Sequence, residues 1–225
     1  MKLSKYQKLL LETLAEYEIA KQFYWTGGTL LAYYYLRHRK SFDLDFFSDT
    51  KFTREDLNPF IHDLINVLGE PKFEERKVYD RWEFILPESF ESLRFEFVYY
   101  NHEKVRLAPL SKYQGILIDS LADLAANKVM AYLDRNEPKD LLDIYFLLKK
   151  RKFTAPKLLK MLSSKFGVNI TEFTFWTEST KQLKNLQTLR PYLLEEDRVK
   201  QDKLFEDIKY FFLDHGREYL AKRLG

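Results

Sequence analysis

The sequence predicts an α+β fold, with a mixed sheet and helices in the first half and a helical region in the second. Up to about residue 112, short apolar stretches alternate with turn residues, which is typical of strands and short helices. Beyond that point the apolar residues recur at helical spacing. Aromatic residues make up 16% of the 225-residue chain, which argues against a disordered protein.

In the first half, residue periodicity and turn residues define the expected elements in chain order. Thr53 is expected to open a helix because Asp56 follows three residues later, and Gly69 is expected to close it. Helices are expected at residues 4–20, 30–36 and 53–69. Strands are expected at residues 23–25, 41–48, 72–79, 81–86 and 93–100.

The second half is expected to be helical, with Pro138, Pro156 and Pro191 marking helix starts or stops. Helices are expected at residues 120–135, 139–150, 155–166 and 195–223. The predicted domains are therefore an α/β core at 1–112 and a helical domain at 113–225, with no flexible linker between them.

Charge and composition exclude several classes of protein. The net charge of +3 is too weak for a dedicated DNA-binding arm but is compatible with a nucleotide or nucleic-acid partner. The chain has no cysteine, so it contains no disulfide or thiolate metal site. No apolar run is long enough to span a membrane, and glutamates interrupt the N-terminal amphipathic segment, so a cytoplasmic location is expected.

A pair of carboxylates on one predicted strand suggests a metal site. Ser41, Asp43 and Asp45 share one face of the strand, and the residues between them are apolar. The two carboxylates would lie about 7 Å apart and repel each other. A hard cation such as Mg²⁺ or Mn²⁺ removes that repulsion. The pattern alone also fits an edge strand with a solvated acidic face.

Glu96 is a third candidate ligand, because it is a single acid between Phe95 and Phe97 on another predicted strand. Placed beside the aspartates, it would complete a three-carboxylate metal site. The alternative is a surface glutamate paired with Arg94 or Lys104.

Gly27, Gly28 and Thr29 form a candidate phosphate-binding turn between a strand and a helix. Adjacent glycines allow a ligand to approach the backbone, and a helix N-terminus favours phosphate. The alternative is a simple tight turn. His38 and Arg39 end the helix, where the dipole favours cations, although Arg39 could also reach a phosphate.

A second polar set lies in the helical half. Lys128 and Arg135 are seven residues apart on one helix face, and Asp140 and Asp143 share a face of the next helix, just after Lys139. A lysine aimed at a triphosphate would offset the charge that develops in phosphoryl transfer. The set could equally be an ion-pair network.

Together these motifs resemble the AbiEii/AbiGii-type nucleotidyltransferases over roughly residues 20–150. One departure is Arg37, at a position before His38 and Arg39 where that family often has glycine. The motifs that carry the resemblance, in chain order, are Gly27-Gly28-Thr29, His38-Arg39-x-Ser41-x-Asp43-x-Asp45-Phe46, Lys128 with Arg135, and Lys139-Asp140-x-x-Asp143.

The resemblance implies a polymerase-β-like nucleotidyltransferase core followed by a helical region, acting as the toxin of a toxin–antitoxin or phage-defence pair. By carry-over from the family, the metal ligands would be Asp43 and Asp45, with Glu96 where the fold often supplies a third carboxylate. The catalytic set would be Asp43, Asp45, Glu96, Lys128 and Asp140. The nucleotide-binding set would be Gly27, Gly28, Thr29, Arg39, Ser41 and Lys128.

The expected partners are a nucleoside triphosphate, an RNA acceptor such as tRNA, and a cognate antitoxin protein. Two alternatives stay open: transfer to a small-molecule or protein hydroxyl, and a catalytically inactive binding module. RNA would need basic and aromatic side chains on the surface of the helical half. The candidates there are Lys181, Lys184, Arg190, Lys200, Lys203, Trp176 and Tyr192.

Overall fold

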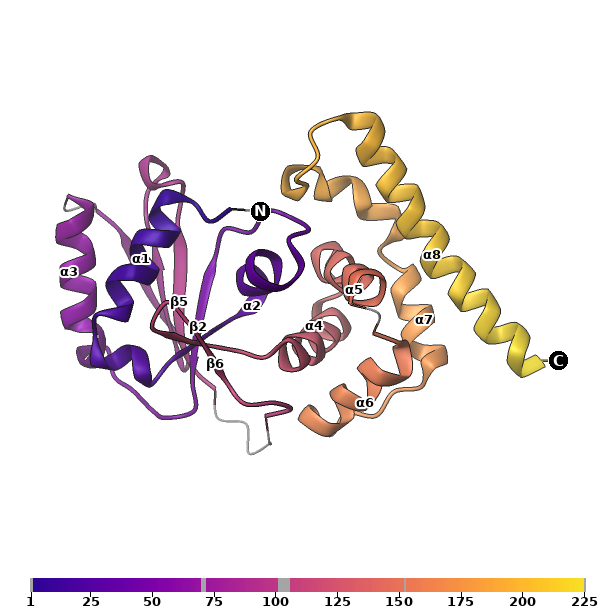
Figure 1. The fold of residues 1–225 in the computed structure, drawn as a ribbon, viewed down its shortest axis with the longest axis horizontal. Coiled ribbons are helices and arrows are strands. Elements are labelled where there is room, and N and C mark those ends of the chain that lie inside the picture. The colour runs from indigo at the N-terminus through magenta and orange to yellow at the C-terminus, as the bar shows by residue number, and fades with distance from the viewer. Residues whose placement is uncertain (1, 70–71, 101–105, 152, 225) are drawn as a thin grey trace. The chain divides into compact units, whose positions relative to one another are not determined.

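A computed structural model describes residues 2–69, 72–100, 106–151 and 153–224 (Figure 1). Chain contacts divide these residues into two units. The described part of the first unit is 2–37, 41–69, 72–100 and 108–120. The second unit takes the short segments 38–40 and 106–107 together with residues 121–224.

The first unit contains a mixed sheet of seven strands in the order β3-β4-β5-β2-β1-β7-β6. The pairs β2–β5 and β1–β7 are parallel, and the other neighbours are antiparallel. The strands are β1 (Tyr24–Thr26), β2 (Leu44–Ser48), β3 (Glu74–Val78), β4 (Arg81–Ile85), β5 (Arg94–Tyr99), β6 (Ser111–Tyr113) and β7 (Ile116–Ile118).

Helices cover both faces of this sheet. The helices α1 (Lys5–Ala15) and α3 (Asn58–Leu68) lie together on one face, and α2 (Gly27–Leu30) lies on the other (Figure 1). A π-helical segment η2 (Leu31–Leu36) continues α2. Short 3₁₀ turns complete the unit at η1 (Glu18–Lys21), η3 (Glu55–Leu57) and η4 (Glu88–Phe90).

The core of the first unit is aromatic and lies between the sheet and α3. Phe46 stacks on Phe97 with ring centroids 5.1 Å apart, and Phe84 stacks on Phe95 at 5.0 Å. Phe60 of α3 meets Phe97 edge-on at 5.8 Å. Because side chains alternate along a strand, the residues between these phenylalanines point to the opposite face of the sheet.

The second unit is helical, as the sequence predicts. The helix α4 packs against α5 and α6, and α7 packs against α8. The helices are α4 (Leu121–Arg135), α5 (Pro138–Lys150), α6 (Ala155–Phe166), α7 (Glu172–Thr180), η5 (Leu183–Tyr192) and α8 (Arg198–Leu224). In the described part of the chain, no helix combines the length and the apolar character that a membrane span requires.

Several predicted boundaries move in the structure. The strand predicted at 41–48 begins only at Leu44, and Phe42, predicted to pack with the apolar face, is 47% exposed. The helix predicted at 4–20 ends at Ala15 and is followed by the η1 turn. The predicted domain boundary at 112 falls inside β6, because the sheet continues to Ile118.

The elements that the sequence did not reveal are short or weakly patterned. Strands β6 and β7 have three residues each and are joined by a turn in which Gly115 has φ +87°. Three residues are too few to show alternation. Helix α7 contains three threonines, whose β-branched side chains lower helix propensity, and it is capped by Thr171.

Candidate functional site

The glycine turn and the acidic strand are in direct contact. In the antiparallel β1–β2 pair, Thr26 lies opposite Asp45, and Gly27 follows at once. Gly27 has φ +77°, and a Cβ at this position would lie 1.8 Å from Asp45 Oδ2. Only glycine lets the backbone come this close to the carboxylate. The structure therefore brings together two motifs that are separated by about 18 residues in the chain.

The segment that leads into β2 is held by α1 and α2. Thr29 is buried, its Oγ1 donates to the carbonyl oxygen of Asp43, and it lies 2.8 Å from Ser41 Oγ. Gln7 Nε2 donates to the carbonyl oxygens of Ser41 and Phe42, at 3.2 and 2.8 Å. Sequence reasoning missed Gln7, although a polar residue on the apolar side of α1 was a usable signal.

Carboxylates follow one another across neighbouring strands. Asp45 lies beside Glu96 in the parallel β2–β5 pair, and Glu96 lies opposite Glu83 in the antiparallel β4–β5 pair. Paired residues point to the same face, so these three acids form a row on the face opposite the aromatic core. Sequence reasoning missed Glu83, although it alternates with Trp82 and Phe84 just as Glu96 alternates with Phe95 and Phe97.

Two arginines offset part of this negative charge. Arg81 Nη1 lies 3.1 Å and Arg94 Nη2 lies 3.4 Å from Glu96 Oε2, and Arg94 also pairs with Glu83. Burial raises the pKa of Glu96, the two arginines oppose this, and Glu83 and Asp43 add to it. The pairing of Glu96 with Arg94 is thus observed. Lys104 lies outside the described residues.

The donor set suits a hard cation bound through two carboxylates. Asp43 is exposed and forms no ion pair with any described residue, and Asp45 is two residues further on. Within residues 2–69, 72–100, 106–151 and 153–224, no three His, Cys, Asp or Glu side chains are grouped closely enough to hold a metal. Mg²⁺ commonly uses one or two carboxylates and completes its shell with substrate phosphates and water. Asp43 and Asp45 fit that role.

The second unit holds a different cluster, centred on Asp143, whose side chain is completely buried. The carboxylate accepts from Arg39 Nε at 2.7 Å, Arg39 Nη2 at 2.9 Å and His38 Nε2 at 2.6 Å. Lys128 Nζ lies 3.0 Å from Asp143 Oδ2 and 3.0 Å from Asp140 Oδ1. Arg135 Nε adds a 2.7 Å bond to Asp140. We call this set the buried ion network.

Protonation in the buried ion network follows from its contacts. Burial alone would raise the pKa of Asp143, but Arg39 and Lys128 hold it well below its ordinary value. Burial lowers the pKa of His38, and its bond to Asp143 opposes this only in part. Its Nδ1 is buried and has no hydrogen-bond partner among the described residues, so an imidazolium would bury an unsatisfied N–H.

The predicted site residues therefore fall into two sets, one in each unit. Gly27, Gly28, Thr29, Ser41, Asp43, Asp45 and Glu96 belong to the first unit. Arg39, Lys128 and Asp140 belong to the second and form part of the buried ion network. The alternative reading of this second set as ion pairs describes what the structure shows, and a contact with nucleotide stays a prediction.

Arg37, the position that departs from the resemblance, has φ +49° and ψ +52°. Glycine adopts this left-handed conformation without steric cost, whereas a side chain disfavours it. The backbone here therefore has the conformation that explains a preference for glycine.

A mixed sheet with a glycine turn against the segment that carries Asp43 and Asp45, followed by helices, is the arrangement that the sequence predicts for a nucleotidyltransferase core. The model of the family described as "Nucleotidyl transferase AbiEii toxin, Type IV TA system" matches residues 8–220. The chain belongs to this family. Its members are nucleotidyltransferase toxins, so the chain is an enzyme of that type.

Individual proteins are similar over nearly the whole chain. The chain is 26% identical over 225 residues to an uncharacterized protein of Aquifex aeolicus. The alignment covers 97% of this chain and 98% of the relative. The crystal structure of JHP933 from Helicobacter pylori matches with a TM-score of 0.56 at 15% identity, over 98% of this chain and 97% of that one. A second Helicobacter pylori crystal structure has the same TM-score and identity and covers 96% of this chain. These structures establish the shared fold.

Proposed function

We propose that this protein transfers a nucleoside monophosphate from a nucleoside triphosphate to an RNA acceptor such as tRNA, with Mg²⁺ or Mn²⁺ as cofactor. It would do so in the cytoplasm as a toxin controlled by a cognate antitoxin protein. The observation that carries the proposal is the contact between Gly27 and the Asp45 carboxylate, with Asp43 two residues earlier. This contact brings the glycine turn, which we expect to bind phosphate, next to the acids that we expect to bind metal.

The metal would be held by Asp43 and Asp45, with Glu96 on the neighbouring strand as the predicted third ligand. Divalent cations in such a site would neutralise charge between the phosphates and the attacking hydroxyl of the acceptor. Arg81 and Arg94 already compensate Glu96, so its part in metal binding would be the weakest of the three.

The chain's own residues would position the nucleotide. Gly27 and Gly28 carry no side chain, so the triphosphate could approach their backbone closely. Thr29 fixes the carbonyl of Asp43 and the hydroxyl of Ser41 through its own hydroxyl. This holds the acidic segment in place before substrate arrives, which lowers the cost of ordering it during the reaction.

The buried ion network would contribute positive charge. Arg39 and Lys128 each carry a positive charge beside Asp143, Arg135 is shared between Asp140 and Glu137, and burial keeps His38 neutral. The predicted attraction of phosphate rests on the charges of Arg39 and Lys128. Asp140 would then act by holding Lys128 in position.

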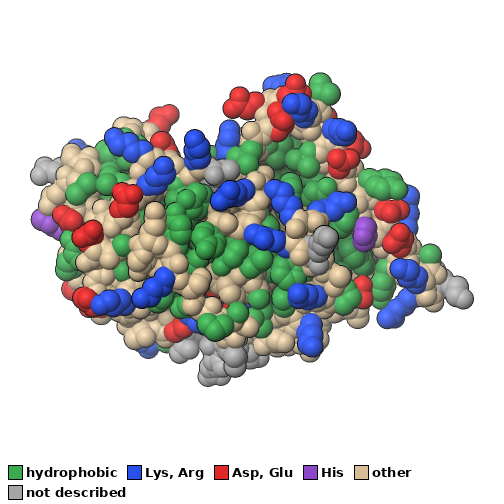
Figure 2. All heavy atoms as spheres, in the orientation of Figure 1, with side chains coloured by type: hydrophobic (Ala, Val, Ile, Leu, Met, Phe, Trp, Pro, Cys, Tyr) green, Lys and Arg blue, Asp and Glu red, His purple; other side chains and the backbone are tan. Residues whose placement is uncertain are grey.

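The acceptor surface predicted in the helical half receives little support. Lys181 pairs with Glu178 at 2.7 Å, Arg190 pairs with Asp202, and Trp176 is only 8% exposed. On the face that Figure 2 shows, basic side chains are scattered singly among hydrophobic ones, and acidic side chains lie mostly toward the margins. RNA contacts would therefore need a more local feature.

Transfer of label tests the proposal. The purified protein would be incubated with Mg²⁺, each labelled nucleoside triphosphate and total cellular RNA. We expect label in RNA, and a loss on the order of 10³-fold or more in Asp43→Ala, because the metal loses a ligand. Asp49→Ala, an exposed aspartate just past the other end of β2, is the matched control and should keep activity.

The other outcomes separate the alternatives. Label on protein or on a small molecule would keep nucleotidyl transfer and reject the RNA acceptor. Equal transfer by Asp43→Ala and the native protein would reject the metal assignment.

A further inference from the structure

The first unit has a pocket that none of the predicted site residues lines. Its volume is about 570 Å³, within the range of small-molecule binding sites. It combines aromatic rings with basic groups. The residues that matter for its chemistry are Lys51, Arg54, Lys77, Tyr79, Trp82 and Tyr99.

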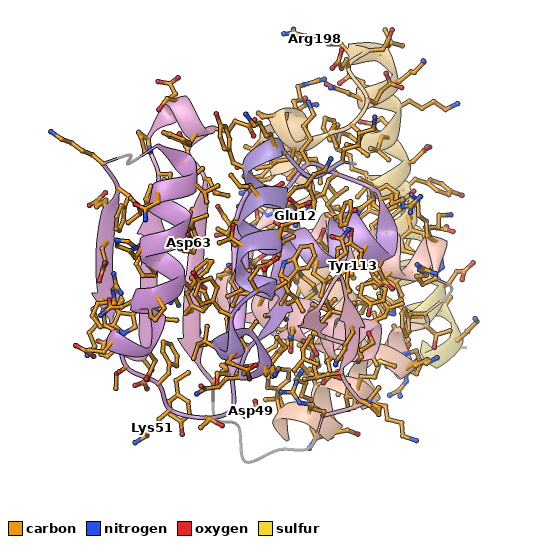
Figure 3. The ribbon with its side chains drawn as sticks, turned by 60° about the vertical axis from the view of Figure 1, so that its left-hand side comes forward. Glu12, Asp49, Lys51, Asp63, Tyr113 and Arg198 are labelled. Carbon is orange, nitrogen blue, oxygen red and sulfur yellow. The ribbon has the colours of Figure 1, made fainter. Side chains whose placement is uncertain are left out.

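This pocket is distinct from the acidic site. Trp82 lies opposite Phe97, and Tyr99 is two residues beyond it, so both rings belong to the aromatic face of the sheet. The acids occupy the opposite face. Asp43 also precedes β2 whereas Lys51 follows it, and the five residues of that strand span about 17 Å. Figure 3 shows Lys51 at the lower end of the sheet, pointing away from the ribbon.

Two of the rings, Tyr79 and Trp82, are accessible from solvent to different degrees. Tyr79 sits in the two-residue turn between β3 and β4 with φ +53°, and its side chain is 92% exposed. Such turns favour glycine or asparagine at positive φ, and a bulky residue there is an outlier. Strained residues concentrate where a side chain has a functional role. Trp82 is half-buried and gives the pocket a second, more fixed ring.

Two lysines beside these rings are available for an anion. Lys77 Nζ lies 5.2 Å from the centre of the Trp82 ring, and Lys51 Nζ lies 5.8 Å from that of Tyr99. Neither lysine forms an ion pair with a described residue, whereas Arg54 is paired with Glu75 at 2.6 Å. Glu55 and Asp80 also line the pocket and could accept hydrogen bonds from the edge of a base.

We propose that this pocket binds a nucleotide, with the base stacked on Trp82 and Tyr79 and the phosphate between Lys51 and Lys77. Aromatic faces next to basic side chains are the combination that binds unpaired nucleotides without regard to sequence. The nucleotide belongs either to a single RNA strand or to a free nucleoside triphosphate. As a contact for acceptor RNA, the pocket rests on the proposed function, and the test separates the two.

Tryptophan fluorescence offers a direct readout, because Trp25 and Trp176 are 0% and 8% exposed and Trp82 is the accessible indole. The full chain would be titrated in EDTA with a single-stranded oligoribonucleotide of about ten nucleotides, or with ATP or GTP. The test variants are Lys51→Ala with Lys77→Ala, and Tyr79→Ala. The control, Lys8→Ala with Lys112→Ala, removes the same charge from exposed positions of the same unit.

We expect the oligoribonucleotide to quench the fluorescence of the native protein and of the control alike. The Lys51 and Lys77 double variant should bind roughly tenfold more weakly and reduce the slope of log affinity against log salt by about 1.4. Tyr79→Ala should bind roughly fivefold more weakly, because one stacking partner is lost. Polyglutamate of equal charge should bind at least about tenfold more weakly, because it has no base to stack.

Each contrary result is informative. No binding by either ligand, equal affinity of the lysine double variant and the control, or equal binding of polyglutamate would overturn the proposal. Quenching by ATP or GTP but not by the oligoribonucleotide would identify free nucleotide as the occupant. RNA bound at the pocket without any transfer of label would support the pocket as a nucleotide site and reject the proposed transfer to RNA. Transfer of label to RNA without binding at the pocket would support the proposed function and reject the pocket as a nucleotide site.

Discussion

The first unit has an acidic site made of Asp43 and the row Asp45, Glu96 and Glu83, and the second unit has the buried ion network. Both combine carboxylates with arginine, yet they leave those carboxylates in different states. Asp143 is fully buried, and four nitrogen atoms from Arg39, His38 and Lys128 satisfy it. Asp43 is exposed and has no ion pair with a described residue. One carboxylate is saturated by the chain itself, and the other is open to a ligand from outside.

The difference shows how residue type alone misleads about a site. Both aspartates belong to Asp-rich motifs, but a buried carboxylate whose lone pairs are all used stabilises the fold in its neighbourhood. An exposed carboxylate next to another acid raises the local negative potential, which a cation can relieve. We therefore expect substitutions in the buried ion network to change stability first, and substitutions of Asp43 or Asp45 in the acidic site to change activity first.

The largest effect on stability should come from Asp143→Ala. It leaves Arg39 as a buried cation without its carboxylate and leaves Lys128 with Asp140 alone, which costs about 3–5 kcal/mol in the free energy of unfolding. Urea denaturation followed by circular dichroism measures this. Asp134→Ala, at an exposed position of α4, is the control and should change stability by no more than about 0.5 kcal/mol. A loss below about 1 kcal/mol for Asp143→Ala would contradict the comparison.

Two glycines allow a sharper test of the acidic site. Gly27 and Gly69 have φ +77° and +81°, so alanine at either position costs about 1–3 kcal/mol in backbone strain. Only at Gly27 would the new Cβ meet the Asp45 carboxylate, since Gly69 has nothing within 4 Å. Gly27→Ala should therefore reduce nucleotidyl transfer by about 100-fold, and Gly69→Ala should leave the rate unchanged. Equal rates in the two variants would show that this contact does not position Asp45 for the reaction.

The smallest effect concerns pH. Burial holds the pKa of His38 below its ordinary value of 6.5, so the unfolded chain takes up this proton first. The free energy of unfolding should fall as pH drops below 6.5, with a slope of up to about 1.4 kcal/mol per pH unit, until the folded pKa is reached. His38→Gln should remove this component, which urea titrations at several pH values would detect. An unchanged slope would assign the pH dependence to other groups.

At lower pH the contribution of Asp143 should be lost as well. Its folded pKa lies well below the ordinary 3.8, so its stabilisation is present above that value and disappears as pH falls through the folded pKa. Asp143→Ala should lack this acid-range loss, and denaturation of that variant between neutral and acid pH would show it.

Local pattern was sufficient for much of the fold. The periodicity of residues 155–166 predicts a helix with those same limits, because Thr154 caps one end and Gly167 ends the other with φ +67°. The strands expected at 81–86 and 93–100 correspond to β4 and β5 within one residue at each end. Local sequence pattern did not predict β6, β7 or α7, because the formation of these elements depends on partners elsewhere in the chain.

The sequence by itself determined the fold class, the family, and the residue types around Asp43 and Asp45, because these follow from local periodicity and from motifs with constant spacing. Tertiary structure alone decided which charged side chains are exposed to solvent and which are buried in ion pairs. Gly27 touches Asp45, Glu83 joins the acidic row, and Asp143 gathers three basic side chains through contacts that are distant in the chain. Strand register and burial set those contacts, and neither can be read from a residue's neighbours in sequence.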